Sequence, residues 1–317
     1  MSAFRYMRTK AFHGRPLVQF QPGETPAAAL DSRAWHLSAD QLGESDYTWL
    51  LERFLETVDT SRVTTLVVGY TGYEGPDPAG PLLAHAASFP RLKALFLGDE
   101  ALDQLWHADI TPVFEGFPLL ERLDVRGQAG LRLREFSSST LKTLRFESCR
   151  LPGDVVRAVA ASDLPALEHL DLWLGAEDAG HGDLEEIHLT RILDGERLPA
   201  LRHLGVENSL IQDDVARAIA TAAVVPRLRS LSLALGTLTD RGAEGLLQGR
   251  PLTHLTRLDL HHHYLTEPAR DRVRTALPGV DVNLDEAMDT DWIVWDEEGN
   301  ALWDEEGFNR VAEGRDF

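Results

Sequence analysis

The sequence predicts an α/β solenoid, a horseshoe with a parallel sheet on its concave side and helices on its convex side. Two observations predict it. A six-residue phrase with aliphatic or aromatic residues at its first, fourth and sixth positions recurs eight times in order, and helix-like stretches separate the phrases. The phrases start at Val63, Leu92, Leu120, Leu141, Leu167, Leu201, Leu228 and Leu255, at spacings of 29, 28, 21, 26, 34, 27 and 27 residues. Such a Leu-x-x-Leu-x-Leu period is typical of leucine-rich repeats.

Each unit reads as a short strand followed by a return segment. A proline two residues before several phrases ends the preceding helix and favours extended chain (Pro90, Pro118, Pro165, Pro199 and Pro226). Apolar residues at helical spacing fill the returns, as in Val155–Val159, Val215–Ile219 and Leu246–Leu247. The 21-residue unit is too short for much helix, so we expect a loop or a 3₁₀ turn there. The 34-residue unit carries an insertion near residues 175–182, which we expect to form a surface loop.

The leucines of one unit cannot be buried by that unit alone. Stacked units share them in one continuous core, and each fully buried leucine stabilises the fold by about 1.5–3 kcal/mol. A degenerate strand at residues 280–284 is expected to close the series. The repeats therefore predict a solenoid of about eight to nine units over residues 63–284.

The two flanks differ from the repeats. Residues 1–62 are predicted to form an N-terminal cap, with a strand at Leu17–Phe20 and an amphipathic helix at Tyr47–Val58 that carries Trp49 on or near its apolar face. Residues 285–317 hold 12 acidic residues and 2 arginines, and repeat Trp-Asp-Glu-Glu-Gly at 295–299 and 303–307. Because this tail is rich in tryptophan, we expect it to pack partly on the last repeat. A solvated tail and a docking motif for a basic partner are the alternatives.

Composition limits the partners and the compartment. The formal charge of −20 argues against binding to the phosphate backbone of a nucleic acid or to an anionic membrane surface. Cys149 is the only cysteine, so no disulfide can form within the chain, which fits a reducing compartment. We find neither a signal peptide nor an apolar run of about 18 residues. These features predict a cytoplasmic protein.

Several phrases resemble a known family. The chain reads Leu-Asp-Leu-His-His-His-Tyr-Leu at 258–265 and Ala-Ser-Asp-Leu-Pro-Ala-Leu-Glu-His-Leu-Asp-Leu-Trp-Leu-Gly at 161–175, and the segments at 54–59, 96–99 and 240–244 add to the match. These phrases resemble an uncharacterised bacterial family of leucine-rich-repeat proteins, over roughly Phe12 to Leu284. The resemblance implies repeats of the ribonuclease-inhibitor type and no established activity. It also implies an accessory role in a small bacterial pathway, because such genes sit beside radical S-adenosylmethionine and sulfatase-like genes.

Strand alternation predicts which side chains face a partner. The leucines point inward, so positions three, five and seven of each phrase point to the concave face, side by side on strands about 4.8 Å apart. The candidate partner-binding residues are Phe96, Asp124, Arg126, Arg145, Glu147, His169, Asp171, Trp173, His203, Glu207, Asp259 and His261. Arg122, Thr143 and Arg257 occupy equivalent positions. This mixture of charges and aromatic side chains is typical of protein-binding surfaces. Trp173 is predicted either to anchor a partner or to cover the insertion that follows it.

Other residues have a structural and a chemical interpretation. His263 falls at the ninth position of its phrase, as Cys149 and Ser209 do in theirs, where repeats of this kind place a buried side chain that bonds to backbone. We therefore expect Cys149 and His263 to be structural, and no metal to bind His261–His263, because consecutive imidazoles do not converge on an ion.

The leading functional hypothesis is a non-enzymatic protein-interaction module without a cofactor, which binds a partner protein on the concave face. The alternative is a metal- or small-ligand-dependent enzyme, in which His169, Asp171, His203 and Glu207 could together hold Zn²⁺ or Mn²⁺. A third possibility is an architectural role with the tail as the binding element. The sequence shows no hydrolase, zinc-protease or nucleotide-binding motif that would favour catalysis.

Overall fold

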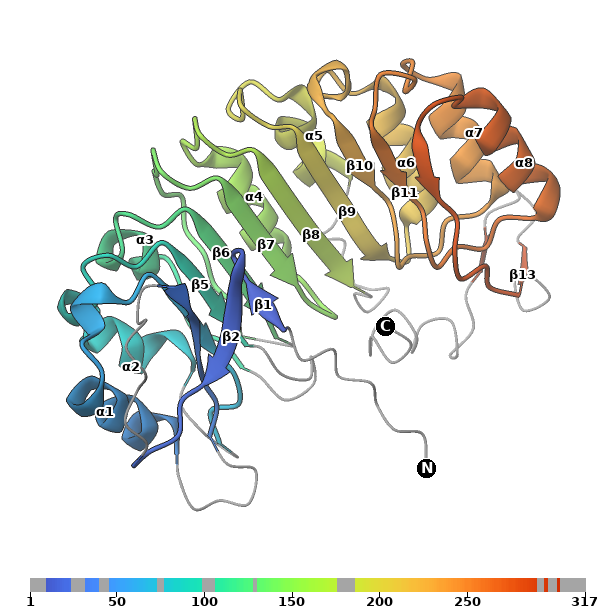
Figure 1. Ribbon diagram of the computed structural model, residues 1–317. Coiled ribbons are helices and arrows are strands. Elements are labelled where there is room, and N and C mark those ends of the chain that lie inside the picture. Colours follow the sequence, from blue (N-terminus) through green and yellow to red (C-terminus); the bar gives the residue numbers. More distant parts are fainter. Residues whose placement is uncertain are drawn as a thin grey trace.

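A computed structural model confirms the leucine-rich-repeat solenoid. It describes residues 10–23, 32–39, 46–72, 77–98, 106–127, 130–175 and 186–289, together with the backbone of 294–295 and 301–302. Twelve strands form one open sheet in chain order, and Figure 1 shows this sheet curving along the inner side of an arc whose outer side carries the helices. All neighbouring strands are parallel except β1 and β2, which form an antiparallel hairpin.

The strands of the sheet follow the predicted phrases closely. They are β1 (Ala11–Phe12), β2 (Arg15–Gln19), β3 (Ala34–Leu37), β4 (Thr65–Val68), β5 (Ala94–Leu97), β6 (Arg122–Arg126), β7 (Thr143–Glu147), β8 (His169–Gly175), β9 (His203–Ser209), β10 (Ser230–Ser232), β11 (Arg257–Asp259) and β12 (Asp281–Asn283). A separate antiparallel pair is formed by β13 (Val294–Trp295) and β14 (Ala301–Leu302).

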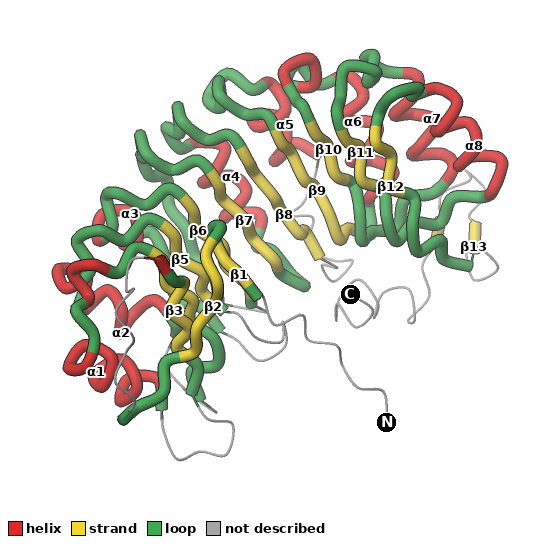
Figure 2. Tube along the Cα trace, viewed as in Figure 1, coloured by secondary structure: helices red, strands yellow, loops and turns green. Residues whose placement is uncertain are grey.

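The helices occupy the return segments. They are α1 (Tyr47–Thr57), α2 (Ala79–Ala84), α3 (Pro112–Gly116), α4 (Gly153–Ala161), α5 (Glu186–Asp194), α6 (Gln212–Thr221), α7 (Asp240–Gln248) and α8 (Glu267–Ala276), with 3₁₀ turns at Thr60–Arg62, Ala86–Ser88 and Val225–Arg227. The described part of the return between β6 and β7 is a loop, as the short 21-residue unit predicts (Figure 2). Of the predicted insertion at 175–182, Gly175 ends β8 and the rest lies outside the described residues.

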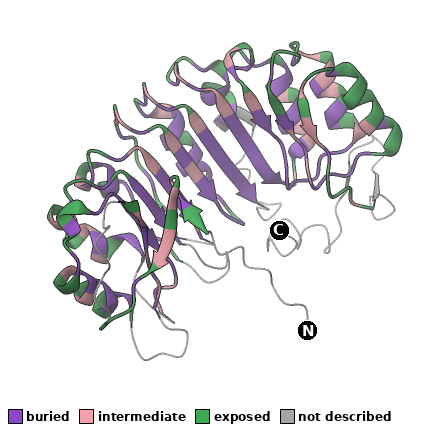
Figure 3. Cartoon of the chain, viewed as in Figure 1, coloured by how far each residue is buried: buried purple, intermediate pink, exposed green. Residues whose placement is uncertain are grey.

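One leucine from each repeat builds the centre of the core. Leucines at the fourth position of their phrases pair directly across the sheet from β4 to β11, and each is at most 1% exposed (Leu66, Leu95, Leu123, Leu144, Leu170, Leu204, Leu231 and Leu258). Figure 3 shows mostly buried residues along the strands from β4 to β9, while exposed residues lie on the outer helices and on the β1–β2 hairpin. The sheet is therefore fixed in register by side chains that no single repeat could bury.

Carboxylates link consecutive repeats at the C-terminal end. Asp213, in the first turn of α6, accepts hydrogen bonds from the backbone N–H (2.8 Å) and the hydroxyl (2.6 Å) of Thr239, the residue before α7. Asp240, in the first turn of α7, accepts the same two bonds from Thr266 before α8, at 2.8 and 2.7 Å. Each of these two threonines also accepts a bond from the first turn of its own helix. We call these two interactions the carboxylate clasps.

The N-terminal segment contains a strand and a helix close to the predicted ones, together with two features that the sequence did not predict. Its strands β2 and β3 pair in parallel with each other and with β4, so they extend the same sheet. Trp49 is 42% exposed, although we expected it on or near the apolar face of its helix; Leu50, Leu51 and Phe54 turn inward instead.

The division into cap, repeats and tail stays a prediction. Apart from its first residues and the β13–β14 backbone, the acidic tail lies outside the described residues. Within the described ranges, every helix is too short or too polar to traverse a lipid bilayer.

An apolar cover closes the concave side at this end of the sheet. Phe12 of β1 lies against Phe96 of β5, with ring centroids 5.6 Å apart, and both are buried with Ala34, Val67 and Ala94. The turn between β1 and β2 makes this possible, because His13 and Gly14 both adopt positive φ (49° and 70°). The hairpin thus folds back over the strands that follow it. We expected Phe96 to be an exposed partner-binding residue, but it is buried under Phe12.

Candidate functional site

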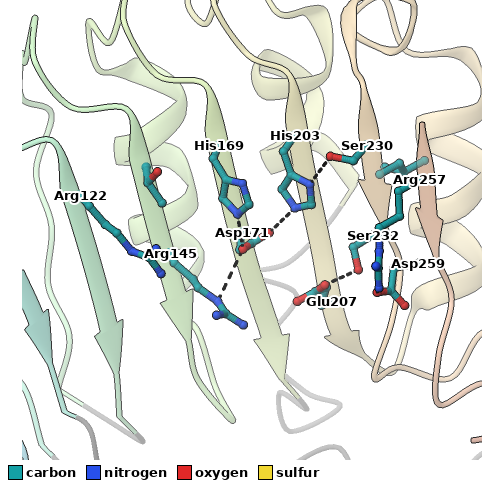
Figure 4. Close-up of a pocket in the computed structure, with 12 residues that line it drawn as sticks. Arg122, Arg145, His169, Asp171, His203, Glu207, Ser230, Ser232, Arg257 and Asp259 are labelled. Carbon is teal, nitrogen blue, oxygen red and sulfur yellow. Dashed lines mark hydrogen bonds and ion pairs between the residues drawn. The ribbon is translucent and has the colours of Figure 1, made fainter. Parts of the chain in front are cut away.

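The concave side of β6 to β11 carries aligned rows of polar side chains. One row runs through Arg122, Thr143, His169, His203, Ser230 and Arg257, and a second through Asp124, Arg145, Asp171, Gly205, Ser232 and Asp259. At position seven, Arg126 pairs with Glu147 and Trp173 pairs with Glu207, which adds two shorter alignments beside the two rows. We call this surface the polar strip. The register confirms the predicted alignment of positions three, five and seven, and a pocket of about 280 Å³ opens in the strip (Figure 4).

Asp171 is the centre of the strip. One of its oxygens accepts a hydrogen bond from His169 Nε2 and the other from His203 Nε2, both at 2.7 Å. The two imidazole rings stack, with centroids 3.9 Å apart, because their residues are direct neighbours on β8 and β9. Burial alone would raise the pKa of Asp171, but the hydrogen bonds from both histidines hold it well below its usual range. Asp171 is therefore a buried anion with two imidazole partners.

A glycine makes room for this carboxylate. Gly205 occupies the second row between Asp171 and Ser232, and a Cβ atom there would lie 2.2 Å from Asp171 Oδ1 and 3.4 Å from Glu207 Cδ. Any larger residue would collide with the Asp171 side chain. The sequence offered a signal that we did not use: Gly205 is the only glycine at the fifth position of the eight phrases.

Glu207 lies beside Asp171 in a different environment. It accepts hydrogen bonds from the indole Nε1 of Trp173 (2.6 Å) and from the hydroxyl of Ser232. Burial, and after it the negative charge of Asp171, raises the pKa of Glu207 to about 7. Two neighbouring carboxyl groups thus differ in protonation, since Asp171 is ionised while Glu207 holds its proton up to near-neutral pH. Such divergent groups in a pocket are a physical marker of functional sites.

Arginines bind the remaining carboxylates. Arg145 Nε lies 2.9 Å from Glu147 and 3.5 Å from Asp171, and its guanidinium group lies over the Trp173 ring at 5.7 Å. Arg126 bonds to the other oxygen of Glu147. Two further pairs bracket this centre. Arg122 contacts Asp124 through Nε and Nη2 at 2.8 and 2.7 Å, and Asp259 is held by Arg257 and His261 at 2.7 Å each.

The structure corrects the expected exposure of several candidates. Trp173 is only 8% exposed and packs with Ala234 and Leu235, so it is not the open anchor that we considered. Four carboxylates expected at the surface are also buried: Asp124, Glu147, Asp171 and Glu207. All of them are on the concave side as predicted, but their neighbours on adjacent strands cover them. Arg126, Arg145, His169, His203, Asp259 and His261 keep partial exposure.

Two serines join the site without having been predicted. Ser230 Oγ lies 2.7 Å from His203 Nδ1, which fixes that ring, and Ser232 bonds to Glu207. Both occupy positions three and five of the phrase that starts at Leu228, so the repeat register alone would have found them. Small neutral side chains gave no chemical reason to select them.

The ninth-position residues have the expected structural roles. His263 is fully buried; its Nδ1 accepts a bond from the Leu265 N–H, and its Nε2 lies 3.2 Å from the Leu284 carbonyl oxygen. Burial lowers the pKa of His263 to about 4, so the ring is neutral and serves as one donor and one acceptor. Cys149 and Ser209 are buried at the equivalent points of their repeats.

The donor set of the strip also bears on the metal hypothesis. His169, Asp171 and His203 can bring one ligand atom each to within 4.8 Å of one another, and they form the one group of this kind among the described residues. Two imidazoles and a carboxylate suit Zn²⁺ or Mn²⁺. Glu207 is directed to Trp173 and Ser232 instead, and the Arg145 cation lies 3.5 Å from the same Asp171 carboxylate. The geometry thus supports three of the four predicted ligands.

A solved structure shares this architecture. A crystal structure of a Bacteroides fragilis protein is similar with a TM-score of 0.73 and 24% identity, over 80% of this chain and 74% of that one. The leucine-rich repeat-containing protein LegL7 from Legionella pneumophila is similar over 95% of this chain and 98% of that one, at 14% identity and a TM-score of 0.43. No family model and no curated protein matches the chain. The likeness to the Bacteroides protein bears on the fold alone.

Proposed function

We propose that this chain is a protein-interaction module that binds a partner protein on its polar strip. The observation that carries the proposal is the alignment of hydrogen-bonding side chains on six adjacent strands around an open pocket. Solenoids of this type commonly bind through such extended concave surfaces. The internal ion pairs hold the side chains in place before a partner arrives, which lowers the entropy cost of binding.

Site-specific photocrosslinking in the native cell tests this proposal. A photoreactive amino acid would replace Ser230 on the concave side of β10 or, as a control, Asp271 on the convex helix α8. We expect a discrete covalent adduct with one protein from the Ser230 position only. Adducts from both positions alike, or from Asp271 alone, would contradict a concave binding surface.

A metal-dependent activity is the second candidate, because His169, Asp171 and His203 could act together as ligands. Metal analysis of the purified protein separates the two functions. Stoichiometric Zn²⁺ or Mn²⁺ that is lost in the His169→Ala, His203→Ala double variant would favour the enzyme. Metal contents that are equally low in both proteins would favour the interaction module.

The proposal also covers the compartment, the class of partner and the role of the protein in the cell. A single buried cysteine suits a reducing, cytoplasmic compartment. The acidic composition makes a protein partner more suitable than a nucleic acid or a membrane surface. The resemblance to a bacterial repeat family favours an accessory role in a small pathway. Fractionation of the native cell, with detection of the chain in the soluble and membrane fractions, tests the compartment.

A further inference from the structure

The ion pairs of the polar strip share one orientation. In each of them the basic side chain is the more exposed partner: the arginine and histidine side chains are 21–50% exposed, whereas the carboxylates are 3–16% exposed. Short Asp and Glu side chains lie close to the sheet, and the longer Arg side chains extend over them. A molecule that approaches the strip therefore meets N–H groups before it meets carboxylates.

These cations retain hydrogen-bonding capacity. A guanidinium group carries five N–H donors and no acceptor. Arg122 contacts Asp124 through Nε and Nη2, and Arg257 contacts Asp259 through Nη2. Beyond the strip, Arg257 Nη1 lies 3.7 Å from the exposed Asp281 of β12, which is too far for a hydrogen bond. The remaining N–H groups of both arginines can bond to a ligand without breaking the internal pairs. Arg257 is the most exposed of the four arginines, at 50%, and lines the same pocket as Arg122, Arg145, His169 and His203.

The charge of the strip also differs from that of the whole chain. Four arginines and five carboxylates give it a formal charge of −1 when histidine is counted as neutral, while the whole chain carries −20 on the same count. The strip is thus a nearly neutral surface with a cationic outer layer on a strongly acidic protein. An acidic ligand is repelled over most of the molecule and finds matching donors here, which restricts where it can bind.

We infer that the partner contacts the strip through an extended acidic segment, with carboxylate side chains that bond to the partly exposed arginines from β6 to β11. This inference rests on the proposed function and names the chemistry of its partner. Six strands about 4.8 Å apart span about 24 Å, which about eight residues of extended chain cover. One carboxylate side chain would enter the pocket between His169, His203 and Arg257. Arg–carboxylate bonds contribute both affinity and geometric specificity to such a contact.

Fluorescence anisotropy with labelled peptides tests the inference on the full chain. The probes are three peptides of about eight residues, which alternate glycine with glutamate, glutamine or lysine. We expect the glutamate peptide to bind about tenfold tighter than the glutamine peptide, and the lysine peptide to bind no better than glutamine, because only carboxylates form charge-assisted bonds here. Equal affinity for the glutamate and glutamine peptides would overturn the inference.

Matched variants locate the contact. Arg122→Gln with Arg257→Gln removes two partly exposed cations of the strip, and Arg217→Gln with Arg272→Gln removes two from the convex helices α6 and α8. We expect about a tenfold loss of affinity for the glutamate peptide in the first pair and less than about twofold in the second. Circular dichroism confirms that each variant is folded. Equal losses in both pairs would overturn the inference. Since Arg145 is more deeply paired, it is left in place so that folding is preserved.

The acidic tail of the same chain is a competing occupant of the polar strip, and a variant tests it. A variant with the 12 Asp and Glu residues of 285–317 replaced by Asn and Gln should bind the glutamate peptide as the natural chain does. Clearly tighter binding would identify the tail as the occupant, since a tethered segment competes at a high effective concentration, and would overturn the external partner. A crosslinked partner whose contact segment is not acidic would overturn the inference and leave the proposed function intact.

Discussion

The two halves of the concave face share one backbone arrangement but differ in their side chains, which are apolar in the N-terminal half and polar in the C-terminal half. On β3, β4 and β5, the inward-curving side presents Ala34, Val67, Ala94 and Phe96, and Phe12 of the first hairpin covers them. From β6 to β11 the equivalent positions are mostly charged or polar, and many of them line a pocket. The leucine core beneath is continuous through both halves. The repeat pattern therefore determines the scaffold, while the side chains at positions three, five and seven decide whether a stretch of it becomes a second core or an accessible surface.

The largest expected effect comes from removing the centre of the polar half. Asp171→Ala should lower the free energy of unfolding by about 4 kcal/mol, because it leaves His169, His203 and Arg145 without their shared anion. Urea denaturation measures this loss. Asp281→Ala is the control, since Asp281 is 71% exposed and lies 3.7 Å from Arg257; it should cost less than about 1 kcal/mol. Similar losses for both would show that Asp171 is no more than a surface ion pair.

The apolar half should respond to loss of its cover. Phe12→Ala should cost about 3 kcal/mol, because Phe12 is 3% exposed and packs on Phe96. Hydrogen exchange should rise in β1 to β5 and stay unchanged in β8 and β9. Leu119→Ala, at a 45% exposed position, is the control and should have little effect. Uniform exchange along the whole sheet would mean that the two halves do not differ in what covers them.

The pH dependence of stability should depend on Glu207. Its pKa is about 7 in the folded chain and near 4.5 in an unfolded one, so the folded chain binds more protons between these values. The contribution of Glu207 to stability therefore falls as pH rises from about 4.5 to 7 and stays low above that. Glu207→Gln, which keeps an acceptor for Trp173, should stabilise the fold by about 2 kcal/mol at pH 8 and by much less at about pH 5.

The control for this effect is Glu244→Gln on α7, where the side chain is 53% exposed. Its effect on the free energy of unfolding should be the same at both pH values. Urea denaturation of the three proteins at both pH values gives the comparison. A Glu207→Gln effect that does not change with pH would show that Glu207 is ionised in the folded chain at pH 5 as well.

An effect of similar size is expected at Gly205, which leaves room for the Asp171 carboxylate. Gly205→Ala should cost about 2 kcal/mol, since the new Cβ would lie 2.2 Å from Asp171 Oδ1 and push that side chain away from His203. The histidine signals of the NMR spectrum should shift for His169 and His203 and stay unchanged for His263. Gly205 lies in β9 and does not have a positive φ, so the effect comes from the contact with Asp171 and not from backbone strain. Unchanged His169 and His203 signals would mean that Asp171 keeps its place.

How much the sequence could predict depends on the range of the contacts involved. The leucine period predicts the strands, their parallel order and the side of the sheet on which His169, Asp171 and His203 lie, because these follow from alternation within one repeat. Burial depends on neighbours. Phe96 is covered by Phe12, which lies 84 residues earlier, outside the repeats that we recognised. The carboxylates are covered because adjacent strands carry longer arginines. To predict this burial, both the strand register and the side-chain rotamers must be known.

The carboxylate clasps have a mechanical consequence. Asp213 and Asp240 each secure the start of the following helix, so the units from β9 to α8 are joined on the convex side as well as through the sheet. A chain that begins to unravel from α8 has to release two such attachments in succession before its damage reaches the strand that carries His203. Opening from the α8 end is therefore opposed at each of the last two units, and the pocket keeps its shape while the outermost turn is strained.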